Sequence, residues 1–269
     1  MALLESRGLT VSYGGLHAND QVDIDITEGK LVGLIGPNGA GKTTFIDAIT
    51  GFTPLSAGTV TFDGVDLEGK SPDERAHLGL TRTFQSLELF EDLTVRDNLM
   101  AAAEKARWNS FITDILMPGR GERAYQQQVD EALDALNLAE YADRLPSDMS
   151  HGQRKLIGVA RALAARPKLV LLDEPAAGLD TRESQKLGFK LREFLSSGMS
   201  LFLIDHDMGL VLNVCDYIYV LDFGRIIAHG TPGEVRKDPT VIAAYLGESA
   251  GEAQASAGTA LNTATEEQS

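Results

Sequence analysis

The sequence is poor in cysteine and has no long apolar run, and each absence excludes a class of protein. Among the 269 residues there is one cysteine, Cys215, so no disulfide can form within the chain. We expect it to be a reduced thiol buried in the core. No stretch of about 18 apolar residues occurs, so no membrane-spanning helix is expected. Residues 1–15 also lack the basic start and long apolar stretch of a signal peptide. Together these absences predict a cytosolic chain, which would need another subunit to hold it at a membrane.

Basic residues are also scarce relative to acidic ones. The chain has 24 lysines and arginines against 39 aspartates and glutamates, which gives a formal net charge of −15. Binding to nucleic acid usually requires clustered lysine and arginine, so we expect no nucleic-acid partner. Residues 248–269 contain four glutamates and otherwise mainly Ala, Gly, Ser, Thr and Gln. This composition cannot bury enough apolar area to offset the entropy of ordering, and it predicts a disordered acidic tail.

The apolar pattern indicates two kinds of strand. Residues 22–26 and 59–64 alternate apolar and polar side chains, which is typical of antiparallel strands with one solvated face. Residues 31–35, 169–172 and 201–204 are continuously apolar, which is typical of parallel strands covered by helices on both faces. The chain therefore reads as an α/β protein.

A helical region interrupts the strands. Between about residues 86 and 166 the sequence becomes charged on one side of helical segments, and PGRG at 118–121 breaks it. We interpret this region as a helical subdomain inserted between sheet strands. The expected domain spans residues 1–247 and ends before the tail.

The stretch GPNGAGKTT at 36–44 fits the phosphate-loop pattern G-x-x-x-x-G-K-[ST], between an apolar strand and an apolar-periodic segment. Its glycines allow backbone N–H groups to face phosphate oxygens, and the following helix adds a positive dipole end. Lys42 is expected to reach the β- and γ-phosphates, and the Thr43 hydroxyl to ligate Mg²⁺. The residues expected to bind ATP here are Gly36, Pro37, Asn38, Gly39, Ala40, Gly41, Lys42, Thr43 and Thr44.

Two adjacent acids end a buried strand in LVLLDEP at 169–175. We expect this strand beside the one that feeds the phosphate loop. Asp173 could then hold Mg²⁺ directly or through water, and Glu174 could act as general base toward an attacking water. Consecutive positions at a strand end give the two carboxylates slightly different directions. The loop and the acids together predict a P-loop NTPase.

Further short stretches resemble the ATP-binding cassette (ABC) ATPases, in the order and spacing of that family. They are MSHGQ at 149–153, AGLD at 177–180, LIDHD at 203–207, RTFQ at 82–85 and Tyr13. Ser150 also stands where the N-cap of a helix would be. The resemblance covers roughly residues 3–247. It implies a P-loop core with an N-terminal antiparallel β subdomain and the inserted helical subdomain.

The resemblance also implies roles for these residues. Tyr13 would stack on adenine, Gln85 would sense Mg²⁺, and His206 would be the switch histidine. Ser150, Gly152 and Gln153 would contact the γ-phosphate, and Asp180 belongs to the D-loop. The signature departs from the commonest LSGGQ, since Met149 and His151 replace Leu and Gly. His151 is either simple family variation or a pH-sensitive element near phosphate. In this family the signature of one subunit closes over the nucleotide of another, so the chain is expected to pair with itself or with a sister ATPase.

Local similarity narrows the expected system. Residues 12–44, 79–99, 108–123 and 238–248 look most like one ATP-binding subunit of the branched-chain amino acid importers. That resemblance implies two transmembrane permeases as partners and a substrate-binding protein that acts with the chain only indirectly. It also implies a place at the cytoplasmic face of the bacterial plasma membrane. The alternatives are a related ATPase for urea or amide uptake or for lipid export, and a soluble ABC ATPase without a transporter. Residues 86–98 are expected to dock a permease, with Leu89 and Phe90 in contact.

Overall fold

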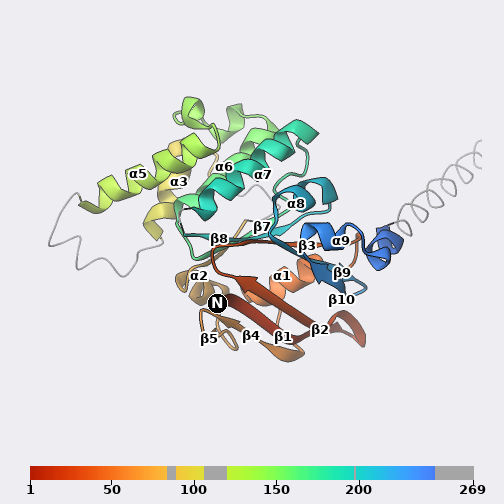
Figure 1. The fold of residues 1–269 in the computed structure, drawn as a ribbon. Coiled ribbons are helices and arrows are strands. Elements are labelled where there is room, and N and C mark those ends of the chain that lie inside the picture. Colours follow the sequence, from red (N-terminus) through yellow and green to blue (C-terminus); the bar gives the residue numbers. More distant parts are fainter. Residues whose placement is uncertain (84–88, 106–119, 197, 246–269) are drawn as a thin grey trace, which may run out of the picture.

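The computed structural model describes residues 1–83, 89–105, 120–196 and 198–245. Figure 1 shows a small sheet at the bottom, a second sheet across the middle and a group of helices above it. Helix α1 (Lys42–Thr50) lies between the two sheets, where Phe45, Ile46 and Ile49 are fully buried. The helix that follows the phosphate loop is therefore fixed from both sides.

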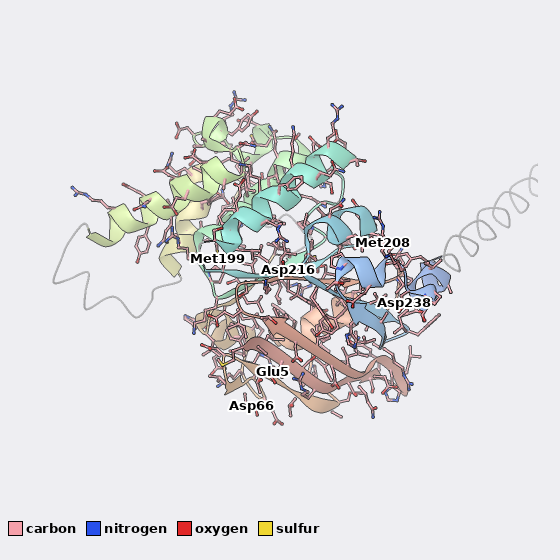
Figure 2. All side chains as sticks on the ribbon, in the orientation of Figure 1. Glu5, Asp66, Met199, Met208, Asp216 and Asp238 are labelled. Atoms are coloured by element: carbon pink, nitrogen blue, oxygen red, sulfur yellow. The ribbon has the colours of Figure 1, made fainter. Side chains whose placement is uncertain are left out.

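The N-terminal sheet is antiparallel, as the alternating pattern predicted. Its order is β2-β1-β4-β5. Val22, Ile24 and Ile26 are fully buried, whereas Asp23 between them is exposed. Glu5 and Asp66, labelled at the bottom of Figure 2, belong to this sheet. The strands are β1 (Ala2–Tyr13), β2 (Leu16–Thr27), β4 (Ala57–Phe62) and β5 (Val65–Asp66).

The central sheet has the order β10-β9-β3-β8-β7-β6, and all its pairs are parallel except β9 with β10. Every residue of β3, β7 and β8 is buried, which confirms the prediction of doubly covered parallel strands. The strands are β3 (Leu31–Ile35), β6 (Leu80–Arg82), β7 (Leu169–Asp173), β8 (Ser200–Ile204), β9 (Tyr217–Asp222) and β10 (Arg225–Gly230).

One expectation about this sheet is wrong. The strand that ends in Asp173 does not lie beside β3, because β8 pairs with both β3 and β7. A single helix, α7 (Thr181–Leu195), links β7 to β8, and strands joined by one crossover helix usually pair. Since these strands run in parallel, their carboxyl ends still meet at one edge of the sheet.

Helices α3 (Val95–Lys105), α5 (Arg120–Ala135) and α6 (His151–Ala164) pack on one another above the sheet. Helix α5 ends at Ala135, and Asn137, just beyond it, adopts a left-handed φ of 56°. Two 3-10 turns follow, at Ala139–Tyr141 and Pro146–Asp148. The first two residues of PGRG and the whole tail at 248–269 lie outside the described residues, so the proposed start of the insertion near residue 86 and the tail remain predictions.

Three shorter helices lie elsewhere in the described chain. They are α2 (Pro72–His77), α8 (Met208–Val214) and α9 (Pro232–Val235). Asp216, labelled near the centre of Figure 2, accepts a hydrogen bond from the N–H of Leu31 at 3.0 Å and pairs with Arg192 of α7 at 3.2 Å. This carboxylate fixes the start of β3 against its covering helix. None of the described helices combines the length and the apolar character needed to cross a membrane.

The buried thiol of Cys215 gives a direct test of this core. Cys215 is 6% exposed, and a Cβ placed on Gly33 of β3 would come within 2.9 Å of its Sγ. Burial raises the pKa of the thiol, with the neighbouring Asp216 acting in the same direction. Because the thiolate is the reactive form, we expect the native protein not to react with Ellman's reagent. One thiol per chain should appear after unfolding in guanidinium. Rapid reaction in the native state would contradict this packing.

Candidate functional site

The phosphate loop connects β3 to α1, and its lysine is folded into it. Lys42 Nζ donates to the carbonyl oxygens of Gly36 at 2.6 Å and Pro37 at 2.9 Å, and the residue is only 8% exposed. Thr43, on the first turn of α1, is exposed. The ammonium therefore lies within the loop, and the neighbouring hydroxyl faces solvent. A phosphate group entering the loop would meet both of these groups and the N-terminal end of α1.

Two segments far away in the sequence hold the loop. The buried Asn19 of β2 donates from Nδ2 to the Gly41 carbonyl at 3.2 Å. The N–H of Gly224, in the turn between β9 and β10, donates to the Ala40 carbonyl at 2.9 Å. The loop is thus anchored from both sheets through main-chain atoms. Asn19 is not among the predicted site residues, since its one signal in the sequence is an amide just before the alternating run of β2.

The adjacent acids leave the end of β7 in different directions. Asp173 is the last residue of the strand, and its side chain is 1% exposed. Glu174 has a left-handed φ of 47°, and its N–H donates to the Ile204 carbonyl of β8 at 2.8 Å. Its side chain is 27% exposed. One acid is therefore embedded at the sheet edge, whereas the other reaches toward solvent.

Burial raises the pKa of Asp173, and the hydrogen bond and charge of Arg82 oppose that rise. Arg82, the last residue of β6, pairs with Asp173 at 2.9 Å and with Asp47 of α1 at 2.5 Å. This arginine was not a candidate in the sequence analysis. The only available signal was a charged residue at the end of a short apolar strand, three residues before Gln85.

His206 follows β8, and its ring lies near two carboxylates. Its Nδ1 is 3.6 Å from Glu174 Oε1 and 3.5 Å from Asp205 Oδ1, and its side chain is 55% exposed. Asp205 is buried, and burial raises the pKa of its carboxyl, while the hydrogen bond from the Asp207 N–H opposes the rise. The structure therefore brings together the predicted base, the predicted switch histidine and an acid, Asp205, that the sequence analysis had not singled out.

The N-terminus of α6 has the predicted cap. Ser150 Oγ accepts from the N–H of Gln153 at 3.3 Å, and Gln153 Oε1 accepts from the N–H of Ser150 at 2.9 Å, which forms a capping box. The first turn lies against the segment after Glu174, since a Cβ on Gly152 would come within 2.9 Å of the Leu179 side chain. The His151 ring lies close to Gly178 in the same way. The predicted signature segment and the predicted D-loop segment of one chain are therefore in mutual contact.

The remaining predicted site residues are Asp180, Tyr13 and Gln85. Asp180 caps α7, where its carboxylate accepts from the N–H groups of Arg182 and Glu183, each at 2.8 Å. Tyr13 ends β1 opposite Leu16 and is 55% exposed, so its ring is accessible. Gln85 lies outside the described residues.

The donor set suits Mg²⁺ held together with a nucleotide. Within the described ranges, no group of three or more His, Cys, Asp and Glu side chains could hold a metal ion by itself. Thr43 offers a hydroxyl and Asp173 a carboxylate. Mg²⁺ commonly takes one or two protein oxygens and completes its octahedron with phosphates and water. These residues fit that pattern better than an all-protein cage.

Two family models match the chain. The model described as ABC transporter matches residues 19–177, and the model described as Branched-chain amino acid ATP-binding cassette transporter matches residues 225–251. The first match spans the phosphate loop, the cap of α6 and the acid pair. The second covers β10 and the segment after it.

Relatives and solved structures agree with these matches. The high-affinity branched-chain amino acid transport ATP-binding protein LivG of Salmonella typhimurium is 38% identical over 91% of this chain and 98% of its own length. BraF of Pseudomonas aeruginosa, with the same description, is 37% identical with the same coverage. The ADP conformation of the ATP-binding cassette MJ1267 has a TM-score of 0.80 and 33% identity, covering 92% of this chain and all of that one. The dimeric bacterial ABC transporter cassette MJ0796 has a TM-score of 0.73 and 25% identity, covering 85% and 98%.

Gly41 allows a test of the loop anchor. It has a φ of 103°, and a Cβ there would come within 2.4 Å of the Ala18 carbonyl oxygen, whereas Gly39 has a φ of 78° and open space around it. Both alanine substitutions carry the left-handed strain of about 1–2 kcal/mol, but only Gly41→Ala adds a backbone clash. We expect Gly41→Ala to lower the thermal unfolding midpoint of the nucleotide-free protein by at least about 5 °C more than Gly39→Ala. Equal unfolding midpoints for the two variants would show that the close approach of β2 to Gly41 does not constrain the loop.

Proposed function

The chain belongs to the ABC transporter family, and we propose that it is the ATP-hydrolysing subunit of a membrane importer for branched-chain or other hydrophobic amino acids. ATP binding and hydrolysis follow from family membership. The observation that carries the substrate class is the match of residues 225–251 to the branched-chain amino acid model, in a chain that is similar to LivG along 91% of its length. This match favours amino acids over urea, amides or lipids, and transport over a soluble role.

In the proposed reaction, the loop residues 36–44 bind the phosphates of ATP, and Lys42 exchanges its carbonyl partners for the β- and γ-phosphates. Thr43, Asp173 and Gln85 would hold Mg²⁺, which neutralises charge on the phosphates when bound. Glu174 accepts a proton from the water that attacks the γ-phosphorus, the bond from that phosphorus to the bridging oxygen breaks, and ADP and phosphate are the products. His206, whose Nδ1 lies 3.6 Å from Oε1 of Glu174, contacts the γ-phosphate. Tyr13 stacks on adenine from the end of β1.

A single chain contains one phosphate loop and one signature segment. We propose that Ser150, Gly152 and Gln153 complete the ATP site of a second subunit, either another copy or a sister ATPase. The dimeric MJ0796 cassette, which has the same fold, supports such pairing. Contact of the signature with Leu179 and Gly178 in the same chain would let Asp180 and its neighbours respond when the two subunits close. Removal of the γ-phosphate would then open the pair.

Glu174→Gln tests the base assignment. The amide keeps the size of the side chain but cannot accept the proton of water, so we expect ATP binding to persist and turnover to fall by at least about 100-fold. ATP should also convert the variant to a stable dimer on size-exclusion chromatography. Fluorescent ATP titration and phosphate release measure the two properties separately. Normal turnover would remove Glu174 from this role.

The same variant tests the transport assignment. Purified with ATP and Mg²⁺ from detergent-solubilised membranes, it should retain two permeases and a shorter ATPase, identified by mass spectrometry. Uptake of labelled leucine, isoleucine, valine and urea by cells with and without the chain would then establish the substrate class. Recovery of ribosomal or DNA-repair proteins without membrane subunits would overturn the importer assignment and leave the ATPase.

We propose that the surface that docks the permease is centred on Phe90. Leu89 was expected to share it, but Leu89 is 8% exposed and belongs to the helical core. Phe90 is 42% exposed, while its backbone N–H and carbonyl are held by the side chain of Asn98 at 2.9 and 3.0 Å. This arrangement presents the ring on a fixed backbone. The surface would place the chain at the cytoplasmic face of the membrane, held by its permeases.

Phe90 and its neighbour also contact α6. The guanidinium of Arg161 lies 5.1 Å from the centroid of the Phe90 ring, and Glu91 pairs with Arg154. Both arginines belong to the helix whose first turn carries the signature. A permease that shifts Phe90 would therefore act on the signature through packed contacts, which is the coupling we propose.

Phe90→Glu tests this surface, with Phe189→Glu as its control. Phe189 is 62% exposed on α7 and lies in a segment with no expected partner. We expect Phe90→Glu to reduce amino acid uptake at least about tenfold, because a charge opposes burial against a permease. ATP hydrolysis by the isolated chain should stay within about twofold, and Phe189→Glu should change neither. Loss of hydrolysis in isolated Phe90→Glu would assign the ring to the fold instead.

A further inference from the structure

Arg82 joins two carboxylates that come from different parts of the ATPase core. It ends β6, the edge strand of the central sheet. Its Nη1 lies 2.5 Å from Oδ1 of Asp47, and its Nη2 lies 2.9 Å from Oδ2 of Asp173. The arginine side chain is 9% exposed and the Asp173 side chain 1%. The pair with Asp173 is therefore shielded from water, unlike the solvated surface pairs that contribute little, whereas the Asp47 side chain is 31% exposed.

The three residues connect elements that the sheet order keeps apart. Asp47 lies on α1, five residues after Lys42, whereas Asp173 ends β7, and β8 separates that strand from β3. The guanidinium spans this separation. It therefore sets the position of the acid relative to the helix that begins at the phosphate loop.

The end of β6 also fixes the backbone of Asp173. The Asp173 N–H donates to Thr83 Oγ1 at 3.2 Å, and the Thr83 N–H donates to the Leu171 carbonyl at 2.9 Å. Consecutive residues, Arg82 and Thr83, thus hold the side chain and the main chain of one acid. The same acid was assigned above to Mg²⁺.

We propose that Arg82 is a positioning residue of the ATPase, which holds Oδ2 of Asp173 against Asp47 of α1 and leaves the other carboxylate oxygen to face the metal and nucleotide. The inference rests on the proposed role of Asp173 in metal binding. A planar guanidinium can serve two carboxylates at fixed directions through different nitrogens, whereas an ammonium is a single point of charge. Geometry as well as charge is therefore required.

Arg75 provides a matched control. It is 8% exposed and, like Arg82, contacts α1, but among the described residues it donates to backbone carbonyls alone, those of Ala48 and Ile49 at 2.9 Å among them. Its loss should affect folding to a similar extent without touching a site carboxylate.

The test combines kinetics with a spectroscopic probe of the metal. Arg82→Met, Arg82→Lys, Asp47→Asn and Arg75→Met are compared with the parent chain for kcat, KM for ATP and thermal unfolding. The same substitutions in the Glu174→Gln background, loaded with ATP, are examined by EPR with Mn²⁺ as the ion, and Asp173→Asn serves as the reference for loss of the ligand.

We expect both Arg82 variants to lower kcat at least about tenfold with KM within about threefold, and to broaden the Mn²⁺ spectrum. Asp47→Asn keeps the contact between Arg82 and Asp173. Its kcat and its Mn²⁺ line width should therefore lie between those of the Arg82 variants and those of the parent chain. Arg75→Met should reduce the unfolding midpoint but keep the parental spectrum and kcat. If Arg82→Met does not fold, the Lys and Asp47→Asn variants carry the same comparison.

Three results would overturn the inference: parental kcat and spectrum in the Arg82 variants, full rescue by Arg82→Lys, or equal changes in Arg75→Met. Full rescue would mean that charge alone suffices. The failure of the proposed metal site has a separate signature, namely an unchanged Mn²⁺ spectrum in Asp173→Asn.

Discussion

The structure depends on holding a glycine-rich loop, which has few side chains of its own, in one conformation. The loop from Gly36 to Gly41 cannot pack itself, so its carbonyls are tied from outside by Asn19 and by the N–H of Gly224. The flanking elements are equally constrained. Strand β3 pairs with β8 and β9, and α1 lies buried between the two sheets. The N-terminal antiparallel sheet thus supports the candidate site, because it packs against one side of α1 and supplies one anchor of the loop.

Parallel pairing explains why the chemical groups meet. Strands β3, β8 and β7 run in the same direction, so the phosphate loop, His206 and the Asp173–Glu174 pair all follow carboxyl ends at one edge of the sheet. Neighbouring strands lie about 4.8 Å apart, and β7 is the second strand from β3. The acids at the end of β7 therefore remain within reach of a phosphate bound after β3 and of its metal. The left-handed φ of Glu174 then turns one acid away from the other. Backbone geometry, more than residue choice alone, separates the proposed base from the proposed metal ligand.

The helices above the central sheet connect the carboxyl edge of that sheet to the exposed ring of Phe90. Helix α6 is capped at its start by Ser150 and farther along carries Arg154 and Arg161, which contact Glu91 and Phe90. A displacement at the exposed aromatic ring has a short path of packed side chains to the signature. Such a path transmits a change only if the helix has two stable positions, which closure onto a second subunit would provide.

The sequence by itself determined the features that depend on neighbours in the chain. Strand periodicity gave the two sheets, the glycine and lysine spacing gave the phosphate loop, and Ser150 followed by Gln153 gave a helix cap, since each signal acts over a few residues. Tertiary structure decided what depends on distant partners. The insertion of β8 between β3 and β7 joins distant strands, the anchoring of Gly41 by Asn19 joins positions 22 residues apart, and the pairing of Arg82 with Asp173 joins positions 91 residues apart. The burial of Leu89 beside an exposed Phe90 was likewise decided by tertiary packing. Such contacts are selected by the global order of strands and by the volume available in the core, and no local pattern of residues encodes either.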